Sequence, residues 1–240
     1  MTNDIKTDPT EEVVDIRDTY IGQVVSGKSF TDVGGLWGTV NEKVSVAHSY
    51  GATQLNMIDI SPPDDPLWTS FDRRCADHSL PDVEHVSTDI IAYAEGQARA
   101  TFDVVHCSGV LYHMPDPVRF LGALRKITGE SLILSSAVTA PRVESEIGVF
   151  EIPRSAMVCV PALHGRDREI LRSYWEGIVG DGALGLTAPQ SSWRPEDFGP
   201  WWWLPTSEAL VGLCEAVGFR QVDGSPTWNG NAYTQLLSVR

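Results

Sequence analysis

The feature that most constrains this chain is a regular alternation of short apolar segments with segments of helical periodicity. The apolar segments have the length of strands and span residues 28–33, 54–60, 83–88, 102–108 and 131–138. Helix-like segments lie between them at 39–50, 66–78 and 116–129, the last opened by Asp116-Pro117 and followed by Gly129. Parallel strands need such crossover connections, so the pattern predicts a mostly parallel sheet with helices on both faces.

Both ends of the chain add to this pattern. Residues 9–25 predict a leading helix, with Asp8 or Thr10 as its cap. Near the C-terminus, Thr206 is expected to cap a helix that ends at Gly218. The segments 219–227 and 233–239 then predict a closing antiparallel hairpin around Trp228-Asn229-Gly230-Asn231.

The alternation breaks at Thr139. Residues 140–204 contain five tryptophans and six prolines, and only 167–178 has a clear helical pattern. A structureless loop of that length is uncommon in a compact domain. We therefore predict a single domain over 1–240, with residues 139–205 inserted as a substrate-binding cap over one end of the sheet.

Composition limits the classes of partner. The net charge of −14 disfavours nucleic acid and anionic membranes as partners. No stretch approaches the ~20 apolar residues of a membrane span, and the polar, acidic N-terminus has no secretory signal pattern. The four cysteines show no paired or zinc-binding spacing. We expect a cytoplasmic protein with reduced thiols and no metal site.

Four segments carry the residues of a predicted ligand site. The first is a strand that runs into the glycine-rich turn DVGGLWG, where backbone N–H groups can approach a ligand closely. Asp59, at the end of the second strand, can accept hydrogen bonds from ribose hydroxyls. The other two are Asp89-Ile90 after the third strand and CSGVLYHMPDP after the fourth.

Together these segments resemble the class I S-adenosylmethionine-dependent methyltransferases that act on small molecules. DVGGLWG, MIDI and STDI are similar to the first three motifs of that family, and FDVVHCSGVLYHMPDPVRFLGALRKI is similar to its fourth-strand segment. The resemblance covers about 28–138 and 206–240. It implies S-adenosyl-L-methionine as the cofactor and a Rossmann-like α/β fold of seven strands, the last antiparallel. One departure is that Gly34 and Gly35 are adjacent, so Leu36-Trp37 replace the later spacer and glycine.

The resemblance also implies roles at the methionine end of the cofactor. Asp32 would lie under the turn, near the methionine amine, and Gly34 and Gly35 would allow close backbone approach. Cys107 and Ser108 would line the crevice there.

At the adenosine end, the resemblance implies four further contacts. Asp59 would bind both ribose hydroxyls and Ile60 would pack on the adenine. Asp89 would accept a hydrogen bond from the adenine amino group, with Ile90 beside it.

The acceptor is expected between the sheet and the cap. His113 and His164 are the candidate general bases, whereas His106 lies within a strand and is expected to be structural. Aromatic side chains suit a sugar face or a flat ring, and the candidates for lining the acceptor pocket are Phe198, Trp201, Trp202 and Trp203. Packing of the cap onto the sheet is the alternative role for these tryptophans.

We predict methyl transfer to a small-molecule acceptor, namely a hydroxyl or amine of a sugar or secondary metabolite. The alternatives are a tRNA wobble-uridine-modifying transferase and a methyltransferase-like domain that binds the cofactor without turnover. A dinucleotide dehydrogenase would explain neither LYHMPDP nor the terminal hairpin, and Cys107-Ser108-Gly109-Val110 differs from the motif of DNA amino-methyltransferases. The expected partners are the acceptor and, as an option, a second copy in a homodimer.

Overall fold

A seven-stranded sheet forms the centre of the computed structural model, which describes residues 15–37, 42–180, 184–188, 193–195 and 199–240. The strands are β1 (Ser29–Val33), β2 (Gln54–Asp59), β3 (Glu84–Ser87), β4 (Phe102–Ser108), β5 (Thr128–Ala137), β10 (Phe219–Thr227) and β11 (Ala232–Val239). Their order is β10-β11-β5-β4-β1-β2-β3, and β11 is antiparallel to both of its neighbours. The predicted sheet with an antiparallel last strand is confirmed.

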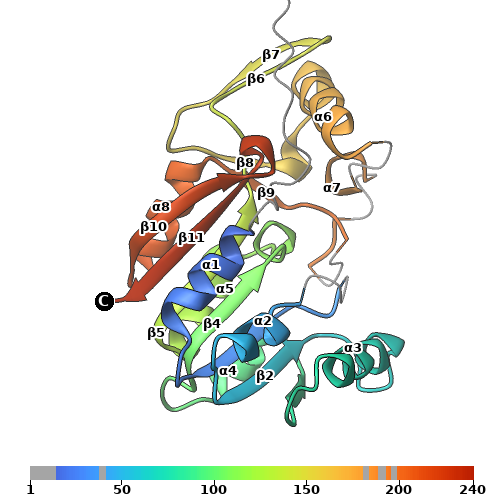
Figure 1. Ribbon diagram of the computed structural model, residues 1–240. Coiled ribbons are helices and arrows are strands. Elements are labelled where there is room, and N and C mark those ends of the chain that lie inside the picture. The colour runs from blue at the N-terminus through green and yellow to red at the C-terminus, as the bar shows by residue number, and fades with distance from the viewer. Residues whose placement is uncertain (1–14, 38–41, 181–183, 189–192, 196–198) are drawn as a thin grey trace, which may run out of the picture.

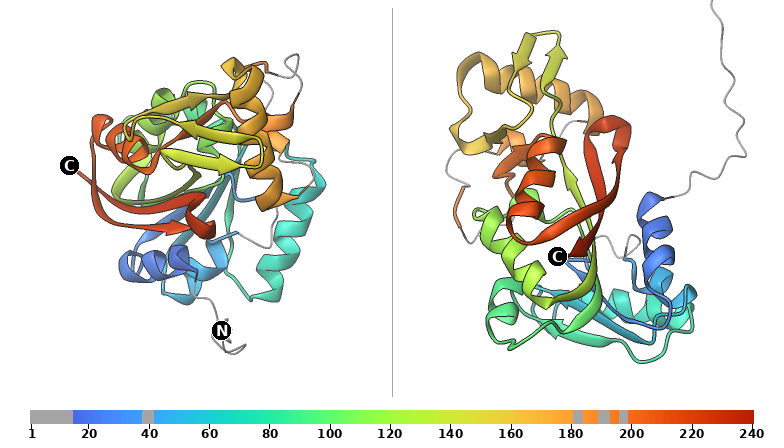
Figure 2. Two further views of the ribbon diagram at one scale, coloured as in Figure 1. Left: turned by 90° about the horizontal axis from the view of Figure 1, so that it is seen from above. Right: turned by 90° about the vertical axis from the view of Figure 1, so that its left-hand side faces the viewer.

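Helices cover both faces of this sheet (Figure 2). One face packs against α1 (Ile16–Val24), α2 (Val44–Ser49) and α3 (Pro66–Asp77), and the other against α4 (Ile90–Glu95), α5 (Pro117–Ile127) and α8 (Ser207–Ala216). The side chains of Asp116 and Thr206 cap α5 and α8 by accepting backbone N–H bonds, as their positions predict.

The structure corrects two element boundaries and adds one helix. The leading helix begins only at Ile16, because Asp15 is extended and its side chain caps the helix; Asp8 and Thr10 lie outside the described residues. The short helix α4, which the apolar pattern did not predict, follows its cap Asp89. Gly129 lies inside β5, whose pairing with β4 already starts at Thr128.

The described residues of 139–205 lie over the end of the sheet at which β4 and β5 finish (Figure 1). This cap contains the hairpin of β6 (Arg142–Ser145) and β7 (Gly148–Glu151), the pair β8 (Met157–Cys159) and β9 (Trp203–Pro205), and the helices α6 (Gly165–Val179) and α7 (Leu184–Thr187). It has a hydrophobic cluster of its own around Trp175 and Trp201. Pairing of β8 with β9 closes the insertion at its base, beside the bond from Thr139 N to Pro205 O.

No helix in the described parts of the chain is long and apolar enough to cross a membrane.

Candidate functional site

The carboxyl ends of β1, β2 and β4 bring the first, second and fourth predicted segments together. β1 pairs with β2 on one side and with β4 on the other, so Val33 lies between Ile58 and Cys107. The turn after β1 is attached to β2 by a bond from Gly34 N to Ile58 O of 2.8 Å. Parallel sheets of this kind bind ligands at such an edge.

The carboxylate of Asp32 lies under this turn and is only 1% exposed. Lys43 N donates to its Oδ2 at 2.9 Å, and His106 Nδ1 donates to its Oδ1 at 2.7 Å. The carboxylate is thus held beneath the turn by the residue before α2 and by β4. His106 is buried, and its bond to Asp32 connects β4 with β1.

Both glycines of the turn are needed for steric reasons. Gly34 has φ 74°, and a Cβ there would lie 2.5 Å from Val110 Cγ2. A Cβ at Gly35 would lie 2.4 Å from Asp32 Oδ2. Of the two residues in the places of the later spacer and glycine, Leu36 is fully buried in the core and Trp37 is 85% exposed. The turn is therefore closely packed at Gly34 and Gly35.

Asp59 ends β2 beside this turn and is 6% exposed. Its Oδ2 accepts from Leu36 N at 3.2 Å, and its Oδ1 accepts from Ser61 N and Ser61 Oγ at 2.9 and 2.8 Å. A carboxylate has about four acceptor sites, so one remains on Oδ2 for a ribose hydroxyl. Binding both ribose hydroxyls would require the Ser61 hydroxyl to turn away. Ile60 is 46% exposed and offers an apolar surface next to Asp59.

The third segment, Asp89-Ile90, forms the start of a helix. Asp89 Oδ1 accepts from Ile91 N and Ala92 N at 2.9 and 3.0 Å, which makes Asp89 the N-cap of α4. Its second carboxylate oxygen can still accept a hydrogen bond from an adenine amino group. The side chain of Ile90 is buried in the main core.

The end of β4 carries one buried and one accessible residue. The thiol of Cys107 is fully buried in the core, and burial raises its pKa. Only the backbone of Cys107 could therefore line the predicted crevice. Ser108 Oγ accepts a hydrogen bond of 3.1 Å from Arg17 Nη1. Arg17 was missed by the sequence reasoning, because it lies 91 residues away on α1.

His113 lies in the 3-10 turn η2 (Leu111–His113) and is attached to the cap. Its Nδ1 donates to the carbonyl of Pro200 at 3.1 Å. Burial lowers the pKa of His113, so the imidazole is neutral at pH 7. Since a carbonyl can only accept, Nδ1 carries the proton in the neutral ring and Nε2 is the unprotonated nitrogen. The backbone of Gly199 is a second hydrogen-bond partner of the ring. His164, by contrast, is an exposed residue before α6 whose Nδ1 donates to Ala162 O.

The three tryptophans of the cap differ in their surroundings. Trp201 is buried, with its ring centroid 4.9 Å from that of Trp175 and 5.1 Å from that of Tyr112. Trp203 Nε1 donates to Pro115 O at 3.1 Å and so connects the cap to the segment before α5. Trp202 is half-buried, and its Nε1 is buried without a partner among the described residues. Phe198 lies outside the described residues.

Tyr112 lies at the boundary of the sheet and the cap, and it was not singled out from the sequence. Its ring packs between His113 and Trp201, its carbonyl accepts from Trp202 N at 2.7 Å, and burial raises its pKa to about 12. The hydroxyl lies 3.5 Å from the position of a Cβ at Gly109, just past the end of β4. Tyr112 therefore connects the sheet edge with the aromatic cluster of the cap.

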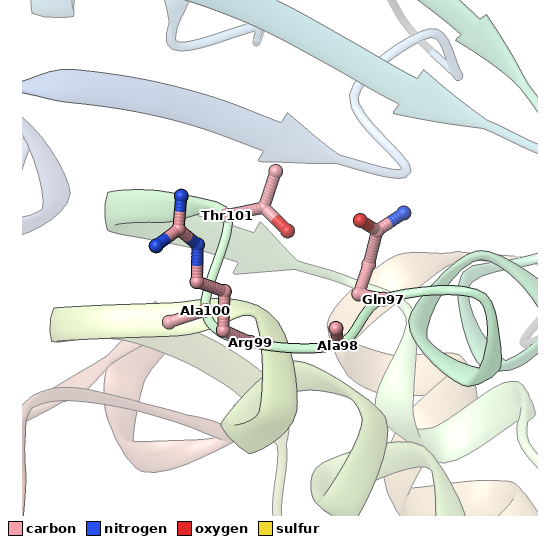
Figure 3. A pocket seen from close by; sticks show the side chains of 5 residues that line it. All are labelled: Gln97, Ala98, Arg99, Ala100 and Thr101. Atoms are coloured by element: carbon pink, nitrogen blue, oxygen red, sulfur yellow. The ribbon is translucent and has the colours of Figure 1, made fainter.

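Two surface hollows lie at the other end of the sheet. One is lined by the loop 97–101, which leads into β4 (Figure 3). The second is lined by residues at the amino ends of β2, β3 and β4. Neither contains a residue of the four predicted segments.

Neither a protein-family model nor a curated protein sequence matches the chain. Solved structures match its fold. Mitomycin 7-O-methyltransferase is 13% identical with a TM-score of 0.56, over 94% of this chain and 53% of that protein. Magnesium protoporphyrin IX methyltransferase from Synechocystis, with bound S-adenosylhomocysteine, is 14% identical with a TM-score of 0.56. The match covers 94% of this chain and 82% of that protein.

A third match is 1,6-didemethyltoxoflavin-N1-methyltransferase from Burkholderia thailandensis, with 1,6-didemethyltoxoflavin and S-adenosylhomocysteine bound. It is 14% identical with a TM-score of 0.54, over 93% of this chain and 75% of that protein. The chain thus spans about half the length of the mitomycin enzyme and more of the other two. These likenesses show that the chain has the Rossmann-like fold of class I methyltransferases.

Proposed function

We propose that this protein is an S-adenosylmethionine-dependent methyltransferase that acts on a small molecule. The observation that carries the proposal is the assembly at one sheet edge of Asp32 under a close-packed glycine turn, Asp59 beside it and Ser108 at the end of β4. The same fold holds S-adenosylhomocysteine in the Synechocystis and Burkholderia enzymes, which supports this cofactor.

S-adenosylmethionine would supply an electrophilic methyl group on its sulfonium. The residues of this chain would bind and orient: Asp59 the ribose, Ile60 and Asp89 the adenine, and the turn at Gly34 and Gly35 the methionine part. Alignment of the two reactants and exclusion of water supply much of the rate of such a displacement. The neutral Nε2 of His113 is the group suited to accept a proton from the acceptor.

The acceptor that we propose is a hydroxyl or amine of a sugar or secondary metabolite. Tyr112 and Trp202, at the boundary of sheet and cap, offer aromatic surface and a buried N–H donor to such a molecule. The net charge of −14 opposes the alternative acceptor, a tRNA. The mitomycin and didemethyltoxoflavin methyltransferases, by their names, act on small molecules.

Calorimetry with S-adenosylhomocysteine tests the cofactor. We expect binding at one site and a higher melting temperature, because the ligand binds the native state. Asp59→Ala should weaken binding by about 1.5–3 kcal/mol through loss of a charge-assisted hydrogen bond. Asp103→Ala is the matched control, since Asp103 bonds to Ser29 at the opposite end of the sheet.

Binding of NAD in place of S-adenosylhomocysteine would reject the proposal in favour of a dehydrogenase. Transfer of labelled methyl groups to a panel of hydroxylated and amino metabolites then tests turnover. Cofactor binding with no transfer to any of them would favour the domain without turnover. Steeply salt-dependent binding of tRNA would favour the RNA-modifying alternative.

A further inference from the structure

The helix α1 is fixed to the candidate cofactor site by a buried lysine. Lys43 Nζ donates to Asp15 Oδ2 at 2.8 Å and to Asp18 Oδ1 at 2.5 Å, and the Lys43 side chain is 7% exposed. The backbone N–H of the same residue donates to Asp32 Oδ2 under the glycine turn. Lys43 therefore connects the start of α1 with Asp32 of β1.

This attachment places a guanidinium at the methionine end of the crevice. Arg17 Nε and Nη2 donate to the carboxylate of Asp15, with Nη2 at 2.6 Å from Oδ2, and Nη1 donates to Ser108 Oγ at 3.1 Å. Nη1 has a second N–H besides the one given to Ser108. The Arg17 side chain is 22% exposed, so a ligand beside Ser108 can reach it.

The charges around Ser108 indicate what that ligand group is. The methionine part of the cofactor carries a carboxylate and two cationic groups, the ammonium and the sulfonium. Asp32, on the neighbouring strand, suits the cations, but the carboxylate needs a cationic partner. Both acceptors of Lys43 Nζ are carboxylates, one of the N-cap and one of the first turn of α1, whereas Arg17 reaches Ser108 itself.

We propose that Arg17 binds the α-carboxylate of the cofactor's methionine part, which makes α1 a wall of the cofactor site. This inference rests on the proposed function. Asp15 holds the guanidinium in one orientation before the ligand arrives, so little side-chain entropy is lost on binding. The carboxylate would take its place next to Ser108 and share Arg17 Nη1 with Ser108 Oγ.

The test compares two ligands that differ in one group. S-adenosylhomocysteine has the carboxylate, whereas S-adenosyl-3-thiopropylamine lacks it and keeps the amine. We expect wild-type protein to bind the decarboxylated compound about 10- to 100-fold more weakly. Arg17→Met should lose about the same factor for S-adenosylhomocysteine and should bind the decarboxylated compound as the wild type does. Arg17→Lys should recover part of the loss.

Arg172→Met, which removes an ion-paired arginine from the surface of α6, is the matched control and should leave both affinities unchanged. Equal loss of both ligands in Arg17→Met would show that Arg17 only supports the fold. Unchanged affinity for S-adenosylhomocysteine would likewise overturn the inference, and in both cases the cofactor proposal would stand. Failure of the wild type to bind either ligand would instead reject the proposed function, and the inference with it.

Discussion

At the scale of single residues, the turn after β1 depends on the missing side chain of Gly35. A Cβ there would lie 2.4 Å from Asp32 Oδ2 and 2.9 Å from Met57 Cε, and Asp32 is fixed by Lys43 and His106. Gly35→Ala should therefore lower the free energy of unfolding by about 1–3 kcal/mol, the usual cost of overpacking. It should also weaken cofactor binding, because Asp32 has to move.

The same substitution at Gly177 is the control for this prediction. Gly177 lies within α6, and a Cβ there meets nothing within 4 Å. Gly177→Ala should leave stability unchanged or raise it by up to about 1 kcal/mol, since alanine is the better helix former. Urea unfolding of the two variants gives the comparison. Equal stability of both would mean that the turn at Gly35 has room that its geometry does not show.

The neutral state of His113 predicts a dependence of stability on pH. Because burial lowers the pKa of His113 below its ordinary 6.5, the unfolded chain takes up this proton at a higher pH than the native protein. The contribution to stability is fully present above pH 6.5 and is lost as the pH falls toward the native pKa. The unfolding free energy of the wild type minus that of His113→Gln should thus decrease from pH 7.5 to 5. A difference independent of pH would contradict a buried neutral imidazole.

At the scale of elements, local signals predicted the sheet and missed most of the cap. The strands 102–108 and 131–138 are apolar runs next to clear helix caps. The hydrophobic pattern and the capping residues were therefore sufficient to predict them. The helix α4 is only six residues long, too short for a periodic stripe, although Asp89 and Gly96 mark its ends. β8 was missed because its partner β9 lies more than forty residues later, and only folding brings them together.

The candidate site likewise contains residues that local sequence predicted and residues that it did not. Asp32, Gly34, Gly35 and Asp59 belong to contiguous motifs, so their positions at the sheet edge could be predicted. Arg17 and Tyr112 could not, because the role of each depends on neighbours from other elements: Ser108 for Arg17, and Trp201 for Tyr112. A residue that joins two elements has no signature within either of them.

At the scale of the whole molecule, the sheet carries the residues proposed for the cofactor, while the cap carries the aromatic cluster. The two meet at Tyr112, His113 and Trp202. Trp201 belongs to the packed interior of the cap, so Trp201→Ala should cost about 3–5 kcal/mol of stability and impair every activity together. It serves as the reference for a purely structural loss.

Substitution of Trp202 is expected to give a different result from substitution of Trp201. Its Nε1 is buried with no partner in the described part of the chain, and an oxygen of the acceptor would satisfy this donor. Trp202→Phe keeps an aromatic ring and removes the N–H. We expect kcat/KM for an acceptor from the metabolite panel to fall about tenfold, as for one lost hydrogen bond, while the Kd of S-adenosylhomocysteine and the melting temperature stay near those of the wild type. If acceptor kinetics do not change, or if all three quantities fall together as in Trp201→Ala, Trp202 lies outside the acceptor pocket and the cap at that point serves only to pack against the sheet.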